Sequence, residues 1–186
     1  WTALDENAFS APTNVSWEVS SDKNFNTIAA SGNFTTDASR DYTVKVIAGG
    51  LLANQKYYYR FSVGNDISVI GKTYTAPNDM AGRVKMALVS CSSLFSGYFN
   101  AYRLIGQDST LSAVLHVGDY IYDFVDEDEE IRVPANLPPD LQDNSISDWR
   151  GRHRLYLTDP DLRLARQNLP FIITWDNHDV AGTGSN

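Results

Sequence analysis

The sequence predicts an all-β sandwich followed by part of an α/β domain. The first part of the chain alternates apolar and polar side chains over short segments, which is the pattern of half-buried strands. The second part alternates apolar runs with helical spacing, which is typical of a parallel sheet with crossover helices. A polar stretch with proline and glycine at 76–82 separates them and indicates a linker. We therefore expect domains at 1–77 and 82–186.

The strands of the first domain are predicted from period-two alternation. Every second residue from Tyr57 to Val63 is aromatic or apolar, so these side chains share one face of a strand. Turn residues separate this strand from others predicted at 15–19, 27–34, 42–47 and 67–75. Tyr57 follows Leu51 by six residues, the spacing of a tyrosine corner, in which the phenol bonds to nearby backbone. We expect an immunoglobulin or fibronectin type III-like sandwich with a packed aromatic core.

The second domain is predicted to contain three buried strands and three helices. The strands are the apolar runs at 84–89, 113–117 and 171–175. A helix at 98–106 joins the first two, which a right-handed crossover makes parallel. Ser147 is expected to cap a helix at 149–156, and Asp159 to cap the next helix, with Pro160 in its first position.

An acidic, proline-rich segment runs from Asp123 to Asn144 and has no periodicity of its own. Its charge run at 126–130 offers oxygen ligands for calcium, but such a block is more often solvated. We predict a solvated loop.

Composition excludes several classes of protein. The formal net charge of −8 argues against binding to nucleic acid, because phosphate backbones require clustered Lys and Arg. No apolar run approaches the roughly 20 residues that span a bilayer, and no signal segment opens the chain. A single cysteine among 186 residues forms no internal disulfide. Because residue 1 is Trp and residue 186 falls in a predicted loop, we expect a fragment of a longer protein.

Each predicted strand of the second domain is followed by side chains that bind metals or transfer protons. They are Cys91 after the first strand, Asp119 and Tyr122 after the second, and Asn177 and His178 after the third. In open α/β sheets, ligands bind outside the carboxyl ends of the strands, so these groups are expected to meet in one crevice. Three acidic groups in one small space would need a multivalent cation to offset their repulsion.

Other interpretations of these residues remain open at this point. Cys91 taken alone is better explained as a buried, inert cysteine, whereas Tyr122 is equally explained as a metal ligand or as a packing aromatic. His178 is flanked by Asp176 and Asp179, which favours a role as proton donor or charge stabiliser over a purely structural one. His116 lies within the second predicted strand, and its side chain is expected to have a packing role.

Five motifs occur in a fixed order along the chain. They are Val-Ser-Cys-Ser at 89–92, Gly-Tyr-Phe-Asn-Ala-Tyr at 97–102, His-Val-Gly-Asp-Tyr-Ile-Tyr at 116–122, Trp-Arg-Gly-Arg at 149–152, and Trp-Asp-Asn-His-Asp at 175–179. This ordered set resembles the PhoD family of alkaline phosphatases and phosphodiesterases, and the first domain resembles the sandwich domain of that family. The resemblance implies a second domain that is the first half of an α/β metallophosphoesterase domain.

The resemblance also implies roles for individual residues. Cys91, Asp119 and Tyr122 match positions that hold Fe3+ in the family, and Asp119 also reaches a Ca2+ site. Asn177 matches a ligand of the second metal and a substrate contact, although the family usually has Asp there. His178 matches the histidine that contacts the reacting phosphate, whereas the remaining family ligands would lie beyond residue 186.

The expected activity is hydrolysis of phosphate monoesters or diesters, with a metal-activated water attacking phosphorus. The family implies an extracellular or periplasmic location. Two alternatives remain, a binding module in which the sandwich acts alone, and a catalytically silent fragment.

Overall fold

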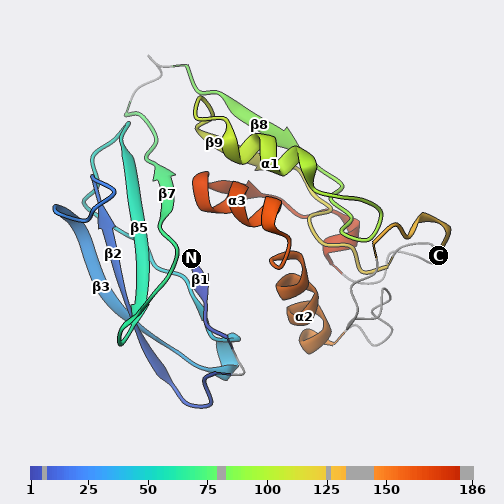
Figure 1. Ribbon diagram of the computed structural model, residues 1–186, viewed down its shortest axis with the longest axis horizontal. Coiled ribbons are helices and arrows are strands. Elements are labelled where there is room, and N and C mark those ends of the chain that lie inside the picture. Colours follow the sequence, from blue (N-terminus) through green and yellow to red (C-terminus); the bar gives the residue numbers. More distant parts are fainter. Residues whose placement is uncertain (6–7, 79–82, 125–126, 133–144, 181–186) are drawn as a thin grey trace. The chain divides into compact units, whose positions relative to one another are not determined.

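The computed structural model describes residues 1–5, 8–78, 83–124, 127–132 and 145–180 (Figure 1). The chain divides into two compact units, Trp1–Arg83 and Val84–Asn186. Most of the acidic segment predicted as a solvated loop lies outside the described residues. Within it, Glu127–Glu129 forms the short 3-10 helix η2, and Asp128 and Glu129 are exposed, as predicted.

The first unit is built from antiparallel strands. Its larger sheet has the order β3-β2-β5-β6, and β7 also pairs with β5. The strands are β2 (Thr13–Ser20), β3 (Ile28–Thr36), β5 (Lys56–Val63), β6 (Asp66–Ile67) and β7 (Gly71–Tyr74). A second sheet pairs β1 (Thr2–Ala3) with β4 (Thr43–Val44), and the 3-10 helix η1 (Ala38–Arg40) precedes β4. Val15 and Phe61 from the large sheet pack on Val44 from the small one, so a core lies between the two sheets.

The tyrosine corner predicted from spacing is confirmed. The hydroxyl of Tyr57 accepts a hydrogen bond of 2.9 Å from the backbone N–H of Leu52. The predicted faces of β5 are also confirmed, because Tyr57 and Phe61 are buried on the same side of the strand.

Two predicted strands of this unit are wrong in extent. The segment 67–75 splits into β6 and β7, because the Ser68 hydroxyl accepts the N–H of Phe61 and interrupts regular pairing. The segment 42–47 reduces to Thr43–Val44. Its start is cut off because Asp41 and Tyr42 have φ angles of 55° and 50°, in the left-handed region.

The second unit contains a three-stranded parallel sheet with the order β10-β9-β8. Its strands are β8 (Met86–Val89), β9 (Ala113–His116) and β10 (Phe171–Ile173), each slightly shorter than predicted. The helices are α1 (Asn100–Gln107), α2 (Ile146–Tyr156) and α3 (Pro160–Asn168), and the 3-10 helix η3 (Asn177–Asp179) follows β10. Gly106 allows α1 to approach α3 closely, since a Cβ there would lie 2.9 Å from the Ala165 nitrogen.

The core of this unit joins all three helices to the segments that follow β8 and β9. Its members are Leu94, Phe95, Phe99, Tyr102, Tyr120, Ile121, Leu155, Tyr156, Leu162 and Ala165. His116 is fully buried at the end of the central strand, as expected, and burial lowers its pKa.

The helix caps correct one prediction and confirm another. Ser145, rather than Ser147, caps α2, because its hydroxyl accepts the N–H of Asp148 while the Asp148 carboxylate accepts the N–H of Ser145. Asp159 caps α3 as predicted, with Pro160 in the first turn. Within the described ranges, no helix has the length and apolar character needed to cross a membrane.

Candidate metal centre

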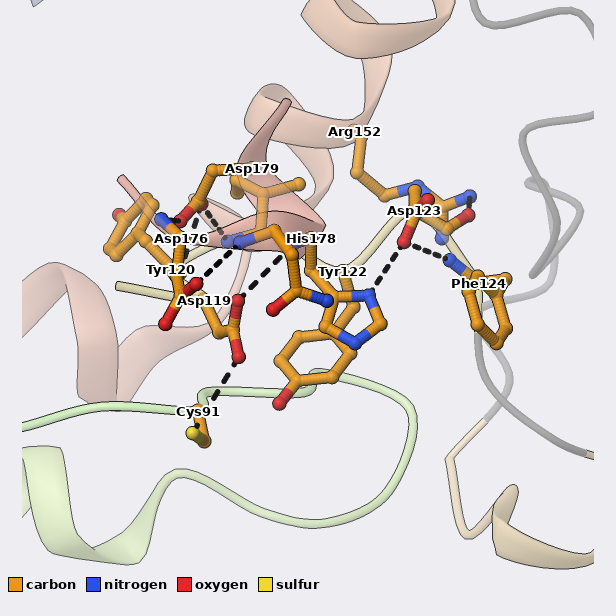
Figure 2. Close-up of polar contacts among 12 residues, drawn as sticks. Cys91, Asp119, Tyr120, Tyr122, Asp123, Phe124, Arg152, Asp176, His178 and Asp179 are labelled. Carbon is orange, nitrogen blue, oxygen red and sulfur yellow. Dashed lines mark hydrogen bonds and ion pairs between the residues drawn. The ribbon is translucent and has the colours of Figure 1, made fainter. Parts of the chain in front are cut away.

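The segments after β8 and β9 are joined at the carboxyl edge of the parallel sheet. The backbone N–H of Cys91 donates to the carbonyl of Gly118 at 3.2 Å, and that of Ser92 donates to the carbonyl of Asp119 at 2.9 Å. This pairing places the Cys91 thiol 3.7 Å from Oδ2 of Asp119, to which it donates (Figure 2). Cys91 is exposed, so the alternative of a buried, inert cysteine is wrong.

Backbone strain is concentrated at this junction. Cys91 and Asp119 have φ angles of 54° and 53°, in the left-handed region that costs L residues about 1–2 kcal/mol. Between β9 and Asp119, Gly118 has a φ of 110°, and a Cβ there would lie 2.5 Å from the Cβ of Asp176. Gly118 therefore permits the tight turn between β9 and Asp119. Strained residues of this kind cluster at functional sites, where the surrounding structure holds them in place.

Tyr122 brings a third acidic group to the same place. Burial raises the pKa of its phenol above the ordinary value, and the neighbouring acidic groups of Cys91 and Asp119 raise it further. The ring also packs, stacking on the His178 imidazole with centroids 4.3 Å apart and planes at 21°. Both interpretations of Tyr122 thus have a structural basis, since its ring packs while its hydroxyl lies with the other acidic groups (Figure 2).

His178 is held by two contacts from the segment after β9. Its backbone N–H donates to Oδ1 of Asp119 at 3.2 Å, and its Nδ1 lies 2.7 Å from Oδ1 of Asp123 (Figure 2). An ionised carboxylate can only accept, so Nδ1 carries the proton of this bond. Nε2 is therefore the nitrogen that remains for a substrate.

Asp179 locks η3 against the segment that follows Asp119. Its Oδ1 accepts the backbone N–H groups of Tyr120 and Ile121 at 3.0 and 2.9 Å, while its Oδ2 accepts the N–H of Asp176 at 3.1 Å. Asn177 lies at the start of η3 and is exposed at the same edge of the sheet. All five residues expected in one crevice therefore come from three segments at one edge.

Asp123 is a site residue that was not predicted, because it stands at the start of the segment expected to be an acidic loop. Asp123 is buried, and its carboxylate also accepts the N–H of Phe124 at 3.1 Å. Its position four residues after Asp119 is a usable signal, but the partner His178 is 55 residues away. The contact therefore depends on the tertiary fold.

Tyr156 on α2 anchors the segments that carry the site. It is fully buried, and its hydroxyl accepts the backbone N–H groups of Leu94 at 3.2 Å and Tyr122 at 3.0 Å. Burial raises the pKa of this phenol to about 12, so it stays protonated at neutral pH.

Removal of the Tyr156 hydroxyl tests this anchor. Tyr156→Phe leaves one buried and one partly buried N–H group without their acceptor, and we expect the free energy of unfolding to fall by about 1–3 kcal/mol. Urea denaturation measures the loss. Tyr98→Phe serves as control because the Tyr98 side chain is 65% exposed, and its midpoint is expected to match the wild type. Equal midpoints for Tyr156→Phe and the wild type would show that the anchor does not stabilise the fold.

The thiol of Cys91, the carboxylate of Asp119 and the phenol of Tyr122 are chemically suited to bind a metal ion. Metal bonds of about 2.3 Å to sulfur and about 2.1 Å to oxygen put two ligands of one ion about 3–3.6 Å apart, close to the observed Cys91–Asp119 distance. Among the described residues, no three His, Cys, Asp or Glu side chains gather closely enough to hold an ion by themselves. The phenol of Tyr122 is thus the third donor that this part of the chain offers to an ion beside Cys91 and Asp119.

Comparisons with known proteins agree with this arrangement. Residues 86–182 match the family model of the PhoD-like phosphatases, and residues 1–77 match that of the PhoD-like phosphatase N-terminal domain. The chain is 34% identical over 176 residues to alkaline phosphatase D of Bacillus subtilis (strain 168), covering 92% of this chain and 30% of that protein. A solved structure titled "Structure of PhoD" superposes with a TM-score of 0.82 at 32% identity, covering 94% of this chain and 35% of the other. The chain thus spans about a third of the length of these relatives. With both of its units matched in order, the chain belongs to the PhoD-like phosphatase family.

Proposed function

We propose that the protein containing this chain is a metal-dependent hydrolase of phosphate monoesters or diesters. The observation that carries the proposal is the convergence of Cys91, Asp119 and Tyr122 beside a histidine with one nitrogen held by a carboxylate. The name of the Bacillus subtilis relative, an alkaline phosphatase, supports the same class of reaction.

We assign Cys91, Asp119 and Tyr122 to an Fe3+ ion, and Asp119 with Asn177 to Ca2+. Burial and the neighbouring Cys91 and Asp119 raise the pKa of the Tyr122 phenol, so this phenol becomes a ligand only where a bound cation deprotonates it. When bound, such cations polarise the phosphoryl group and lower the pKa of water, which supplies the nucleophile. Asn177 removes one negative charge compared with an Asp ligand, so the second ion is expected to bind more weakly.

His178 is the proposed catalytic residue. Asp123 fixes Nδ1, so Nε2 faces the reacting group, where it donates a hydrogen bond to the phosphoryl oxygen or a proton to the leaving oxygen. Asn177, next to it, is placed to contact the substrate. The stacked ring of Tyr122 limits rotation of the imidazole and so maintains this direction.

We further propose that the two units are a fibronectin type III-like sandwich and the first half of an α/β metallophosphoesterase domain. Parallel sheets are normally covered on both faces. In this sheet Met86, Leu88 and Ile172 are 48%, 69% and 55% exposed, which favours a second layer from elsewhere in the protein. An extracellular or periplasmic location is the expectation from the family.

Metal removal tests the proposed function. The protein containing this chain is expected to release p-nitrophenol from p-nitrophenyl phosphate or its bis ester and to contain iron and calcium. Dialysis against a chelator is expected to lower turnover at least about a hundredfold, because the cations supply several kcal/mol of charge stabilisation. Readdition of Fe3+ and Ca2+ restores it. Full turnover in a metal-free preparation would contradict the proposal.

A further inference from the structure

A pocket of about 300 Å³ lies beside the candidate metal centre, between the segment after β8 and helix α1. Its walls include Cys91, Ser93, Ser96, Tyr98, Phe99 and Ala101. Cys91 is thus shared by the pocket and the candidate metal centre. Through Cys91, the pocket adjoins the candidate metal centre.

The walls of the pocket are neutral. None of its described lining residues is Asp, Glu, Lys, Arg or His. The Ser93 and Ser96 hydroxyls bond to each other at 2.9 Å, and the rings of Tyr98 and Phe99 supply apolar surface.

One cation approaches the same rings. The guanidinium of Arg132 lies 5.3 Å from the ring centroid of Tyr98 and 5.1 Å from that of Phe99. Its charge is balanced by Asp159, at 2.6 Å. The pocket therefore favours an uncharged group that combines apolar surface with a few hydroxyls.

The inner wall is held by buried hydrogen bonds. The Ser92 hydroxyl lies 2.6 Å from that of Tyr102 and 3.1 Å from Nε2 of His116. Phe99 is buried and packs edge-on against Tyr102, with ring centroids 5.3 Å apart. Because these side chains are already fixed, ligand binding costs little side-chain entropy, as expected for a preformed site.

We propose that this pocket binds the uncharged alcohol part of the phosphate ester, while the phosphoryl group lies at the candidate metal centre. The proposal rests on the proposed function and adds to it a class of substrate. A volume of about 300 Å³ matches the lower end of small-molecule pockets and holds an organic group about the size of a phenyl or sugar ring. Esters with such a neutral group are thus preferred over those with a methyl or a charged group.

Non-hydrolysable phosphonates test the pocket separately from catalysis. Inhibition constants are measured for phenylphosphonate, methylphosphonate and 2-aminoethylphosphonate against hydrolysis of p-nitrophenyl phosphate by the whole protein. We expect phenylphosphonate to bind about tenfold more tightly than the other two, because only its neutral ring fills the pocket.

Two variants narrow the pocket from different sides, and a third variant serves as a matched control. Ala101→Phe on α1 and Ser96→Leu on the preceding segment are each expected to weaken phenylphosphonate about tenfold and to change methylphosphonate less than about twofold. Leu104→Phe adds the same ring to α1 at a position that is 68% exposed and outside the pocket lining, and it is expected to change neither constant. An unchanged methylphosphonate constant also shows that each variant is folded.

The possible failures are distinguishable. Absence of phosphate ester turnover in the wild-type protein would overturn both the proposed function and the pocket. Normal turnover with equal constants for phenylphosphonate and methylphosphonate would overturn the pocket alone. The pocket alone would also be overturned if both narrowing variants left phenylphosphonate binding unchanged. It would likewise be overturned if 2-aminoethylphosphonate bound most tightly of the three.

Discussion

Asp119→Asn is expected to lower phosphatase turnover about a thousandfold and to remove most of the bound iron. Asp119 is buried, its Oδ2 lies beside the Cys91 thiol, and its Oδ1 accepts the N–H of His178. Asparagine keeps the size of the side chain and one acceptor oxygen, so the fold is retained while the negative charge is lost. Loss of a cation that supplies several kcal/mol accounts for an effect of this size.

Three measurements check this prediction. Turnover and metal content of the purified protein are compared with the wild type, and visible absorbance reports any iron bound by thiolate or phenolate. Asp108→Asn is the matched control, since Asp108 bonds to Lys85 and Thr110 away from the site. Wild-type turnover and metal content in Asp119→Asn would show that this carboxylate is not a ligand.

The position of the candidate site was predictable because it depends on strand ends. Runs of apolar residues located β8, β9 and β10 to within about two residues, and parallel strands bring their carboxyl ends to one edge. Cys91, Asp119 and His178 each follow such an end. Their meeting therefore follows from local patterns combined with one rule of topology.

The conformation of the site was less accessible to local reasoning. The left-handed backbone of Cys91 and Asp119 opposes the intrinsic preference of both residues, and Gly118 alone signals the turn. The backbone bonds between the segments after β8 and β9 maintain this conformation, and they join residues 27 positions apart. Spacing within one segment carries no information about such bonds.

The error at the start of α2 has a different origin. Ser145 and Ser147 are both good cap residues, and propensity alone does not separate them. Asp148 does, because it stands three residues after Ser145 and completes a reciprocal pair of hydrogen bonds. The information was present in the sequence as the pattern Ser-x-x-Asp.

The pair formed by His178 and Asp123 leads to the second large effect. His178→Ala is expected to lower turnover about 10² to 10⁴-fold, the usual contribution of a positioned acid. Asp123→Asn keeps the shape of its side chain but removes the charge that stabilises a protonated imidazole, and we expect a loss of about 10 to 100-fold. Both effects are expected in kcat more than in KM, because the proton or hydrogen bond is needed most in the transition state.

A double-mutant cycle separates this role from a structural one. If Asp123 acts through His178, Asp123→Asn changes turnover little in a His178→Ala background, so the two losses are strongly non-additive. The backbone carbonyl of Asp123, which accepts from Arg152, is retained in every variant, so unfolding midpoints are expected to stay close together. Additive losses would instead mean that Asp123 acts on turnover independently of His178, for instance by maintaining the segment that carries Tyr122.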